Sequence, residues 1–365
     1  ELDGPRGRIY LIKQVLEGAP PTRSTQLHLD RCLTCRNCET TCPSGVQYGH
    51  LVDMGRKIVD AKVPRPLGER AVRWALKEGL TSPLFDSAMQ AGQALRGVLP
   101  ASVRAKVPVP TAAGHWPRRQ HARKVLLLEG CVQPSMAPGI NAATVRVLDA
   151  VGIQAVIAPE AGCCGAVKFH LNDQQGALAQ MRANIDAWWP RVGSDAVECI
   201  VLNASGCGAM VKEYGHHLQH DAQYAAKAAR ISALARDLSE LLPDIAASLQ
   251  GQLRNVPQGV VALQSPCTLQ HGQRLRGGIE QHLRALGFDV RVAQEAHLCC
   301  GSAGTYSVLQ PQLSQALRTR KLGHLQALGP SVIASANIGC ITHLQSGTDT
   351  PVRHWVQVLD EALAG

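Results

Sequence analysis

Four cysteines and a proline lie close together near the start of the chain, in the stretch RCLTCRNCETTCP. The spacing is C-x2-C-x2-C-x3-C-P and is formed by Cys32, Cys35, Cys38, Cys42 and Pro43. Two-residue gaps let successive thiolates reach different irons of one cubane cluster, and this spacing is typical of iron–sulfur proteins. The proline lacks an N–H and turns the chain away after the last thiol. The run therefore predicts a site that binds iron and sulfide.

Other uses of these four cysteines fit the spacing less well. A structural zinc site usually takes two C-x2-C pairs separated by a longer loop, so this crowded run would have to fold back sharply around one ion. Disulfides between such near neighbours would be strained or sterically excluded. Chance clustering at this spacing is improbable. We therefore favour the cluster over zinc.

The fourth cysteine of such a run has a different partner from the other three. In two-cluster ferredoxins it ligates the other cluster, so Cys32, Cys35 and Cys38 would hold one cluster and Cys42 would serve a second. A second run should then exist, and this sequence has none. Because the first residue is Glu1 and not methionine, we expect the partner run upstream of it.

The remaining cysteines follow an internal repeat that begins near residue 124. KVLLLEGCVQP in the first copy matches GVVALQSPCTLQ in the second, and EAGCCGA matches EAHLCCGSAG. The spacing from the single cysteine to the first of the double cysteine is the same in both copies, which indicates duplication. The candidate metal ligands of the two copies are Cys131, Cys163, Cys164, Cys207, Cys267, Cys299, Cys300 and Cys340.

Each copy has the order strand, helix, strand, helix, strand, which is the pattern of an α/β unit. Apolar strands alternate with helical segments, for which we expect residues 141–153 and 172–188 in the first copy and 277–290 and 310–327 in the second. The cysteines come just after strand ends. Parallel strands place such residues together at the carboxyl edge of the sheet. We therefore expect four thiols at one edge of each copy.

Some residues near these motifs have simpler roles. A double cysteine can be two small core residues, or a vicinal disulfide that acts as a redox switch. Cys199 lies in an apolar strand without a counterpart in the second copy, so we expect it to pack in the core. Histidines beside the cysteines are more often structural hydrogen bonders than ligands; they are His170, His271, His297 and His343.

The composition describes a globular chain of 365 residues with room for two or three domains. Apolar residues make up 45% and no run of 18 apolar residues occurs, so no segment is expected to span a bilayer. The net charge of +9 is not organised into an aromatic-interleaved basic stripe, and we expect no nucleic-acid partner. It suits an acidic protein or an anionic membrane face. Thirteen cysteines indicate a reducing compartment.

Taken together, these motifs resemble the iron–sulfur subunit of bacterial glycolate oxidase (glycolate dehydrogenase), with its paired cysteine-rich (CCG) domains. The resemblance covers essentially the whole chain. It rests on DGPRGRIYLIKQ, HLDRCLTCRNCETTCPSGV, EAGCCGAV, NIDAWWP, ASGCGAMVKEYG, CTLQHGQ, HLCCGSAGTYS, ANIGCITHL and VRHW. The lactate-utilisation iron–sulfur protein, the small subunit of anaerobic glycerol-3-phosphate dehydrogenase and the cysteine-rich subunit of heterodisulfide reductase are wider relatives.

The resemblance implies an electron carrier. It implies two [4Fe–4S] clusters in the full-length protein, held by Cys32, Cys35, Cys38 and Cys42 together with the upstream run. It also implies flavin-containing partner subunits that carry FAD and oxidise glycolate to glyoxylate, and a quinone-like acceptor. The expected location is the cytoplasm, at most peripheral to the cytoplasmic face of the inner membrane. No catalytic residue is expected in this chain, which has no G-x-G-x-x-G motif opening a βαβ unit.

The repeat departs from its wider relatives at one position in each copy. In heterodisulfide reductase relatives each CCG domain ends in C-x2-C, whereas Ala204 and Asn337 stand here three residues before the last cysteine. Four thiolates per copy remain for a [4Fe–4S] cluster, another metal or redox thiols. The alternatives are a lactate-utilisation, glycerol-3-phosphate dehydrogenase or heterodisulfide-reductase type of subunit with redox chemistry at the CCG domains, or a colourless zinc scaffold.

The expected fold class is α/β, with an incomplete helical ferredoxin-like part followed by two duplicated domains with parallel sheets. The expected domains are a partial [4Fe–4S] domain at 1–60, a helical or linker segment at 61–123, and CCG domains at 124–250 and 251–365.

Overall fold

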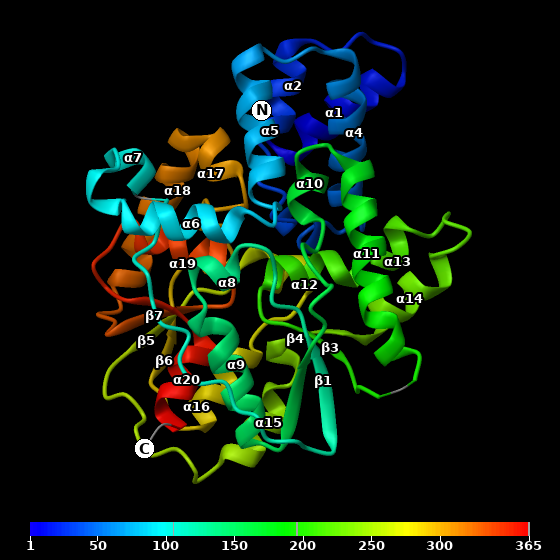
Figure 1. Cartoon of the computed structure of the whole chain (residues 1–365). Coiled ribbons are helices and arrows are strands. Elements are labelled where there is room, and N and C mark those ends of the chain that lie inside the picture. Colours follow the sequence, from blue (N-terminus) through cyan, green and yellow to red (C-terminus); the bar gives the residue numbers. More distant parts are fainter. Residues whose placement is uncertain (105, 195, 364–365) are drawn as a thin grey trace.

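The chain folds into a helical N-terminal region followed by two α/β units (Figure 1). The computed structural model describes residues 1–104, 106–194 and 196–363. The helices of the N-terminal region are α1 (Pro5–Leu16), α2 (Arg23–Asp30), α3 (Asn37–Thr40), α4 (Tyr48–Lys62), α5 (Leu67–Gly79), α6 (Phe85–Ala94), η1 (Arg96–Val98) and α7 (Ala101–Arg104). Residues 106–122 form no helix or strand and lead into the first α/β unit.

The first α/β unit is built on a four-stranded parallel sheet in the order β2-β1-β3-β4. Its strands are β1 (Arg123–Leu127), β2 (Ile153–Ile157), β3 (Ile200–Leu202) and β4 (Ala235–Asp237). Its helices are α8 (Gln133–Met136), α9 (Gly139–Ala150), α10 (Ala166–His170), α11 (Gln174–Val192), α12 (Ser205–Lys212), α13 (Tyr214–His217), α14 (Ala225–Leu234), η2 (Leu238–Glu240) and α15 (Leu242–Leu249).

The second α/β unit repeats this topology with the order β6-β5-β7-β8, again all parallel. Its strands are β5 (Val261–Leu263), β6 (Val290–Val292), β7 (Val332–Ser335) and β8 (Val352–His354). Its helices are η3 (Thr268–Gly272), α16 (Gly278–Ala285), α17 (Tyr306–Leu309), α18 (Pro311–Gln326), α19 (Ile338–Gln345) and α20 (Trp355–Leu363). The matching strand orders confirm the predicted duplication and the parallel sheets.

Parallel strands are covered by helices on both faces, and the burial of β1 shows this directly. Val125 and Leu127 point into one apolar core, while Leu126 between them points into another on the opposite face. The first of these cores continues into the second unit, where it includes Val261 and Trp355. The two units therefore share one core instead of meeting only at their surfaces.

Each sheet has one more strand than the sequence analysis expected. β4 and β8 follow a helix and pair with β3 and β7 at the sheet edges. Both are three residues long and carry charged residues, so neither gives the alternating or continuous apolar signal that identifies longer strands. The predicted strand–helix–strand–helix–strand order is correct as far as it goes, and an edge strand completes each unit.

The N-terminal helices pack around a small core of their own. Ile12 of α1, Leu29 of α2, and Val52 and Val59 of α4 are fully or almost fully buried there. In Figure 1 the helices α1, α2, α4 and α5 lie at the opposite end of the molecule from the C-terminus, with α10 of the first unit beside them, whereas α6 and α7 lie near α17 and α18. None of the helices in the described part of the chain is long and apolar enough to cross a membrane.

Candidate functional site

The cysteine run of the N-terminal region lies on the loop between α2 and α4 that also contains the short helix α3. Cys32 follows the end of α2, and Cys38 lies in α3. Thr34 and Arg36, on either side of Cys35, both adopt left-handed backbone conformations, with φ of 54° and 57°. Such conformations are uncommon for residues with a side chain and cluster at functional sites. They turn the loop tightly on both sides of Cys35.

Hydrogen bonds from neighbouring residues hold Cys32 in place. The Thr34 N–H and the Tyr48 hydroxyl donate to its Sγ at 3.4 Å and 3.6 Å. Arg56, almost fully buried on α4, donates to the carbonyl oxygens of Leu29 and Cys32. The loop is thus fixed from both its side-chain and its backbone atoms.

The structure brings Cys32, Cys35 and Cys38 together and leaves Cys42 apart. Burial and the neighbouring charge of Cys267 raise the pKa of Cys35 to about 12. Burial, followed by the charges of Cys35 and Cys32, raises the pKa of Cys38 to about 11. Backbone N–H groups of residues 44–46 lower the pKa of Cys42 instead, and no other thiol is among the influences on it. Such a separation is what the assignment of Cys42 to a different cluster requires, and that assignment stays a prediction.

The four thiols of the first α/β unit form a chain of neighbours. Interaction with Cys131 lowers the pKa of Cys163 to about 3 and correspondingly raises that of Cys131. Cys164 interacts with Cys163 and with Cys207, and burial adds to the rise in its pKa. The thiols from three loops of this unit therefore lie near one another, as the positions of the strands predict.

The second unit repeats the arrangement in a more buried setting. Cys267, Cys299 and Cys300 have raised pKa values, for which interactions with neighbouring thiols and burial are the causes. Cys300 also interacts with Cys340, and the Gly301 N–H donates to Cys299 Sγ at 3.3 Å. Each double cysteine is followed by a glycine in the left-handed region, Gly165 at φ 94° and Gly301 at φ 91°.

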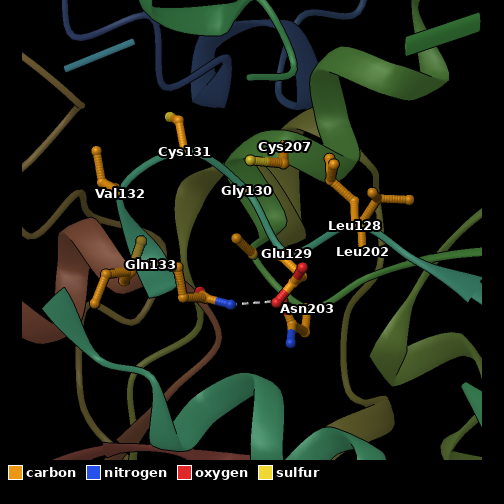
Figure 2. A pocket seen from close by; sticks show the side chains of 11 residues that line it. Leu128, Glu129, Gly130, Cys131, Val132, Gln133, Leu202, Asn203 and Cys207 are labelled. Atoms are coloured by element: carbon orange, nitrogen blue, oxygen red, sulfur yellow. Dashed lines mark hydrogen bonds between the residues drawn. The ribbon is translucent and has the colours of Figure 1, made fainter. Parts of the chain in front are cut away.

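A small cavity of ≈ 30 Å³ lies beside Cys131 and Cys207 in the first unit (Figure 2). Glu129 and Gln133 also line it, and Gln133 is hydrogen-bonded to Asn203, as the dashed line shows. Among the residues that the structure describes, the buried Oε1 atom of Gln133 has no hydrogen-bond partner, and burial raises the pKa of Glu129. The cavity has room for a water or two, since one water needs roughly 10–15 Å³ of such volume. It is too small for a quinone ring.

The donor sets match what an iron–sulfur cluster requires in chemical type. They are buried or partly buried thiols from several loops, and metal binding would replace their protons. Within residues 1–104, 106–194 and 196–363, no three His, Cys, Asp or Glu side chains are already arranged around a single ion position. The thiols form chains of neighbours instead, so loading with metal requires rotation of cysteine side chains.

Comparison with known proteins places this architecture in a family. Residues 125–212 and 261–345 both match the model of the cysteine-rich domain CCG. The whole chain is 53% identical to the glycolate oxidase iron–sulfur subunit of Escherichia coli (strain K12), of which it covers 89%. The chain belongs to the glycolate oxidase iron–sulfur subunit family.

More distant relatives agree with that membership. Over 96% of the chain, the identity to the probable glycolate oxidase iron–sulfur subunit of Bacillus subtilis (strain 168) is 29%, with 84% of that protein covered. Lactate utilization protein A of Geobacillus kaustophilus is 27% identical over 65% of the chain and is covered to 98%. Within the glycolate oxidase iron–sulfur subunit family, the repeat units described above are the CCG domains.

Two residues that support the N-terminal thiols were missed by sequence reasoning. Tyr48 lies a few residues after Cys42, and its position as a lone aromatic near the run could have marked it. Arg56 gave no signal, because an arginine on an amphipathic helix is ordinarily exposed. Its burial is evident only once α4 packs against the end of α2.

The histidines near the repeat cysteines mainly form hydrogen bonds. His271 Nε2 donates to the His297 carbonyl oxygen at 2.9 Å, and His343 Nε2 lies 3.1 Å from Ser314 Oγ. His170 lies 3.8 Å from Asp53. Cys199, which we expected in the core, is half-buried just before β3, and burial raises its pKa to about 11.

Proposed function

We propose that this chain is the electron-transfer iron–sulfur subunit of a glycolate-oxidising flavoenzyme complex. Electrons pass from the flavin of a partner subunit through this chain towards a quinone-like acceptor, while glycolate becomes glyoxylate. The observation that supports the proposal is the grouping of Cys32, Cys35 and Cys38, with no other thiol among the influences on Cys42, in a chain of this family. When bound, a [4Fe–4S] cluster supplies one-electron transfer there.

The residues of the chain contribute binding, orientation and exclusion of water. Cys32, Cys35 and Cys38 bind the first cluster, and Cys42 binds the second together with thiols from elsewhere in the full-length protein. Arg56 and Tyr48 hold the loop in place at Cys32, through hydrogen bonds to its carbonyl oxygen and to its Sγ atom. Burial of the thiols lowers the local dielectric and favours cluster forms of low net charge.

The CCG domains offer two further sets of ligands. The proposed residues are Cys131, Cys163, Cys164 and Cys207 in the first domain and Cys267, Cys299, Cys300 and Cys340 in the second. No residue of the chain is proposed to act on glycolate. FAD belongs to the partner subunits of the hetero-oligomer, which works in the cytoplasm or at the cytoplasmic face of the inner membrane. The proposed domains are 1–60, 61–123, 124–250 and 251–365.

Cys35→Ser and Cys199→Ser form a matched pair for testing this proposal. Cys35 lies in the N-terminal group, whereas Cys199 lies outside all three groups of thiols. In the full-length complex, Cys35→Ser should abolish one cluster signal in the low-temperature EPR spectrum and stop reduction of the acceptor. Cys199→Ser should change neither.

Stopped-flow measurements separate electron transfer from substrate chemistry. Glycolate should reduce the partner's flavin at the same rate with wild-type chain, with the Cys35→Ser variant and without this chain. Loss of flavin reduction on omitting the chain, with the partner still folded, would show that this chain contributes to glycolate oxidation. An unchanged EPR spectrum in the Cys35→Ser variant would refute the cluster assignment.

A competing function places redox chemistry on the CCG thiols themselves, as in a lactate-utilisation, glycerol-3-phosphate dehydrogenase or heterodisulfide-reductase type of subunit. The interactions between neighbouring thiols in each domain support this competing function, because thiols that lie close together can react with one another. Iron and sulfide content distinguishes the two functions. Eight irons in the full-length protein mean that only the N-terminal clusters are present and leave the CCG thiols free, whereas a higher content means that the CCG domains are loaded.

A further inference from the structure

The cysteine run does not stand symmetrically between the two CCG domains. The charge of Cys267 acts on Cys35, and the charge of Cys35 acts in turn on Cys299, so Cys35 lies near two thiols of the second domain. No thiol of the first domain is among the main charges acting on Cys35 within the described part of the chain. Cys35, the second cysteine of the run, therefore lies nearer to the thiols of the second domain than to those of the first.

Hydrogen bonds fix this approach independently of the thiols. Thr40 in α3, just after Cys38, lies 3.0 Å from Nδ1 of His271 in η3. His271 is buried, and its Nε2 lies 2.9 Å from the His297 carbonyl, two residues before Cys299. A carbonyl only accepts, so Nε2 carries the proton and Nδ1 accepts from Arg276 at 2.9 Å.

A second contact joins the same two parts of the chain. Tyr306 comes shortly after the double cysteine of the second domain. Its hydroxyl donates to the carbonyl oxygen of Arg31 at 3.2 Å. Arg31 directly precedes Cys32. The loop of the run is thus attached at both of its ends to segments that carry thiols of the second domain.

The contacts of the N-terminal region with the first domain are of another kind. They are partly buried ion pairs and hydrogen bonds to α10 and to the residues that directly precede α11 and α13, such as Lys168 with Glu78 at 3.0 Å and Arg36 with Glu213. His50 also stacks on His216, with ring centroids 4.0 Å apart. These contacts dock the region on the first domain without bringing a cysteine of the run against its thiols.

We propose that the centre held by the N-terminal run exchanges electrons directly with a second iron–sulfur cluster in the second CCG domain, at the place where Cys35 lies near Cys267 and Cys299 and where the hydrogen bonds of Thr40 and Tyr306 join the two parts. The first CCG domain is not its direct partner. This inference rests on the proposed electron-transfer function. In each step one electron leaves the reduced cluster of the run and enters the oxidised cluster of the second domain, with no bond made or broken and no proton transferred.

Magnetic coupling in the loaded full-length protein tests this route without an activity assay. Two paramagnetic clusters in close contact speed up each other's spin relaxation. Cys267→Ser should remove this enhancement from the signal of the N-terminal cluster, and the matched variant Cys131→Ser in the first domain should retain it. The reverse pattern, or no change in either variant, would overturn the proposed route.

A second pair of variants leaves every thiol in place. Thr40→Val removes the hydroxyl that contacts His271, whereas Thr41→Val removes an exposed hydroxyl that donates to the Asn37 carbonyl oxygen at the start of α3. Thr40→Val should weaken the relaxation enhancement and Thr41→Val should not. Equal effects of the two substitutions would contradict the role of this contact.

The outcomes separate this inference from the function on which it rests. If the wild-type protein shows no iron–sulfur signal, the proposed function fails. If the N-terminal cluster is present but the second CCG domain holds no cluster, or holds one that does not interact with it, only the route fails.

Discussion

Replacement of Gly301 by alanine should destabilise the second CCG domain more than the same change at a glycine that has open space around its Cα atom. Gly301 follows the double cysteine at φ 91°. A Cβ atom there would lie 2.3 Å from the carbonyl oxygen of Ser314 and 3.1 Å from Leu317 Cβ. The nearer atom belongs to the backbone of α18, so no side-chain rotation relieves the clash.

Two separate costs contribute to the expected effect. The left-handed conformation costs an L-residue about 1–2 kcal/mol, and forcing extra volume into a packed site typically costs about 1–3 kcal/mol. Their sum predicts a loss of roughly 2–5 kcal/mol in the free energy of unfolding, against a usual total of about 5–15 kcal/mol.

Gly329→Ala is the control that separates the two costs. Gly329 has φ 62° but no atom within 4 Å of an added Cβ, so this variant carries only the conformational cost. Urea unfolding followed by far-UV circular dichroism should show Gly301→Ala to be less stable than Gly329→Ala by about 1–3 kcal/mol. Equal stability of the two variants would refute the view that α18 closes tightly over the cysteine loop.

Two further predictions concern the attachment of the N-terminal region to the first CCG domain and the support of its cysteine loop. Burial alone would raise the pKa of Glu213, but His50 and Arg36 outweigh it and lower the pKa to about 2 from 4.5. Because the pKa of Glu213 is lower in the folded state than in the unfolded state, the ionised carboxylate stabilises the folded protein at pH values above the unfolded pKa. About 3 kcal/mol of the free energy of unfolding should therefore be lost as the pH falls from about 5 to 2. Urea unfolding across this range should show that loss in the wild type and in exposed Glu17→Gln, and not in Glu213→Gln. Arg56→Ala should lower stability by about 1–3 kcal/mol and release the cluster, because the buried Cys32 carbonyl loses its partner at 2.6 Å. Exposed Lys57→Ala should do neither, and equal cluster content in the two variants would contradict this role.

The repeat and its parallel sheets were predictable because they leave strong local signals. Strands buried on both faces are continuous apolar runs, and the equal cysteine spacing marks the duplication. Helix ends were less certain. The segment at 277–290 was expected to be helical, but α16 ends at Ala285, since Gly287 adopts φ 94° and the chain then enters β6. Left-handed glycines of this kind commonly end helices.

The thiol groups within each domain were predictable for the same reason as the sheets. Loops that follow parallel strands meet at one edge, so the spacing of strands and cysteines fixes which thiols come together. The position of Cys35 against Cys267 was not predictable in this way. It depends on tertiary contacts such as Thr40 with His271, which join residues far apart in the sequence and have no local pattern.

Duplication gave the chain two similar CCG domains, but their surroundings make them different. Near Cys207 and Cys340 the domains are joined to each other, since the Ser205 N–H donates to the Ala336 carbonyl at 3.0 Å and Asn337 Oδ1 accepts from the Gly206 N–H at 3.3 Å. Asn337, at a position where wider relatives have a cysteine, instead joins the two domains. The proposed route from Cys35 to the second domain would therefore distinguish two domains that the sequence repeat alone makes equivalent.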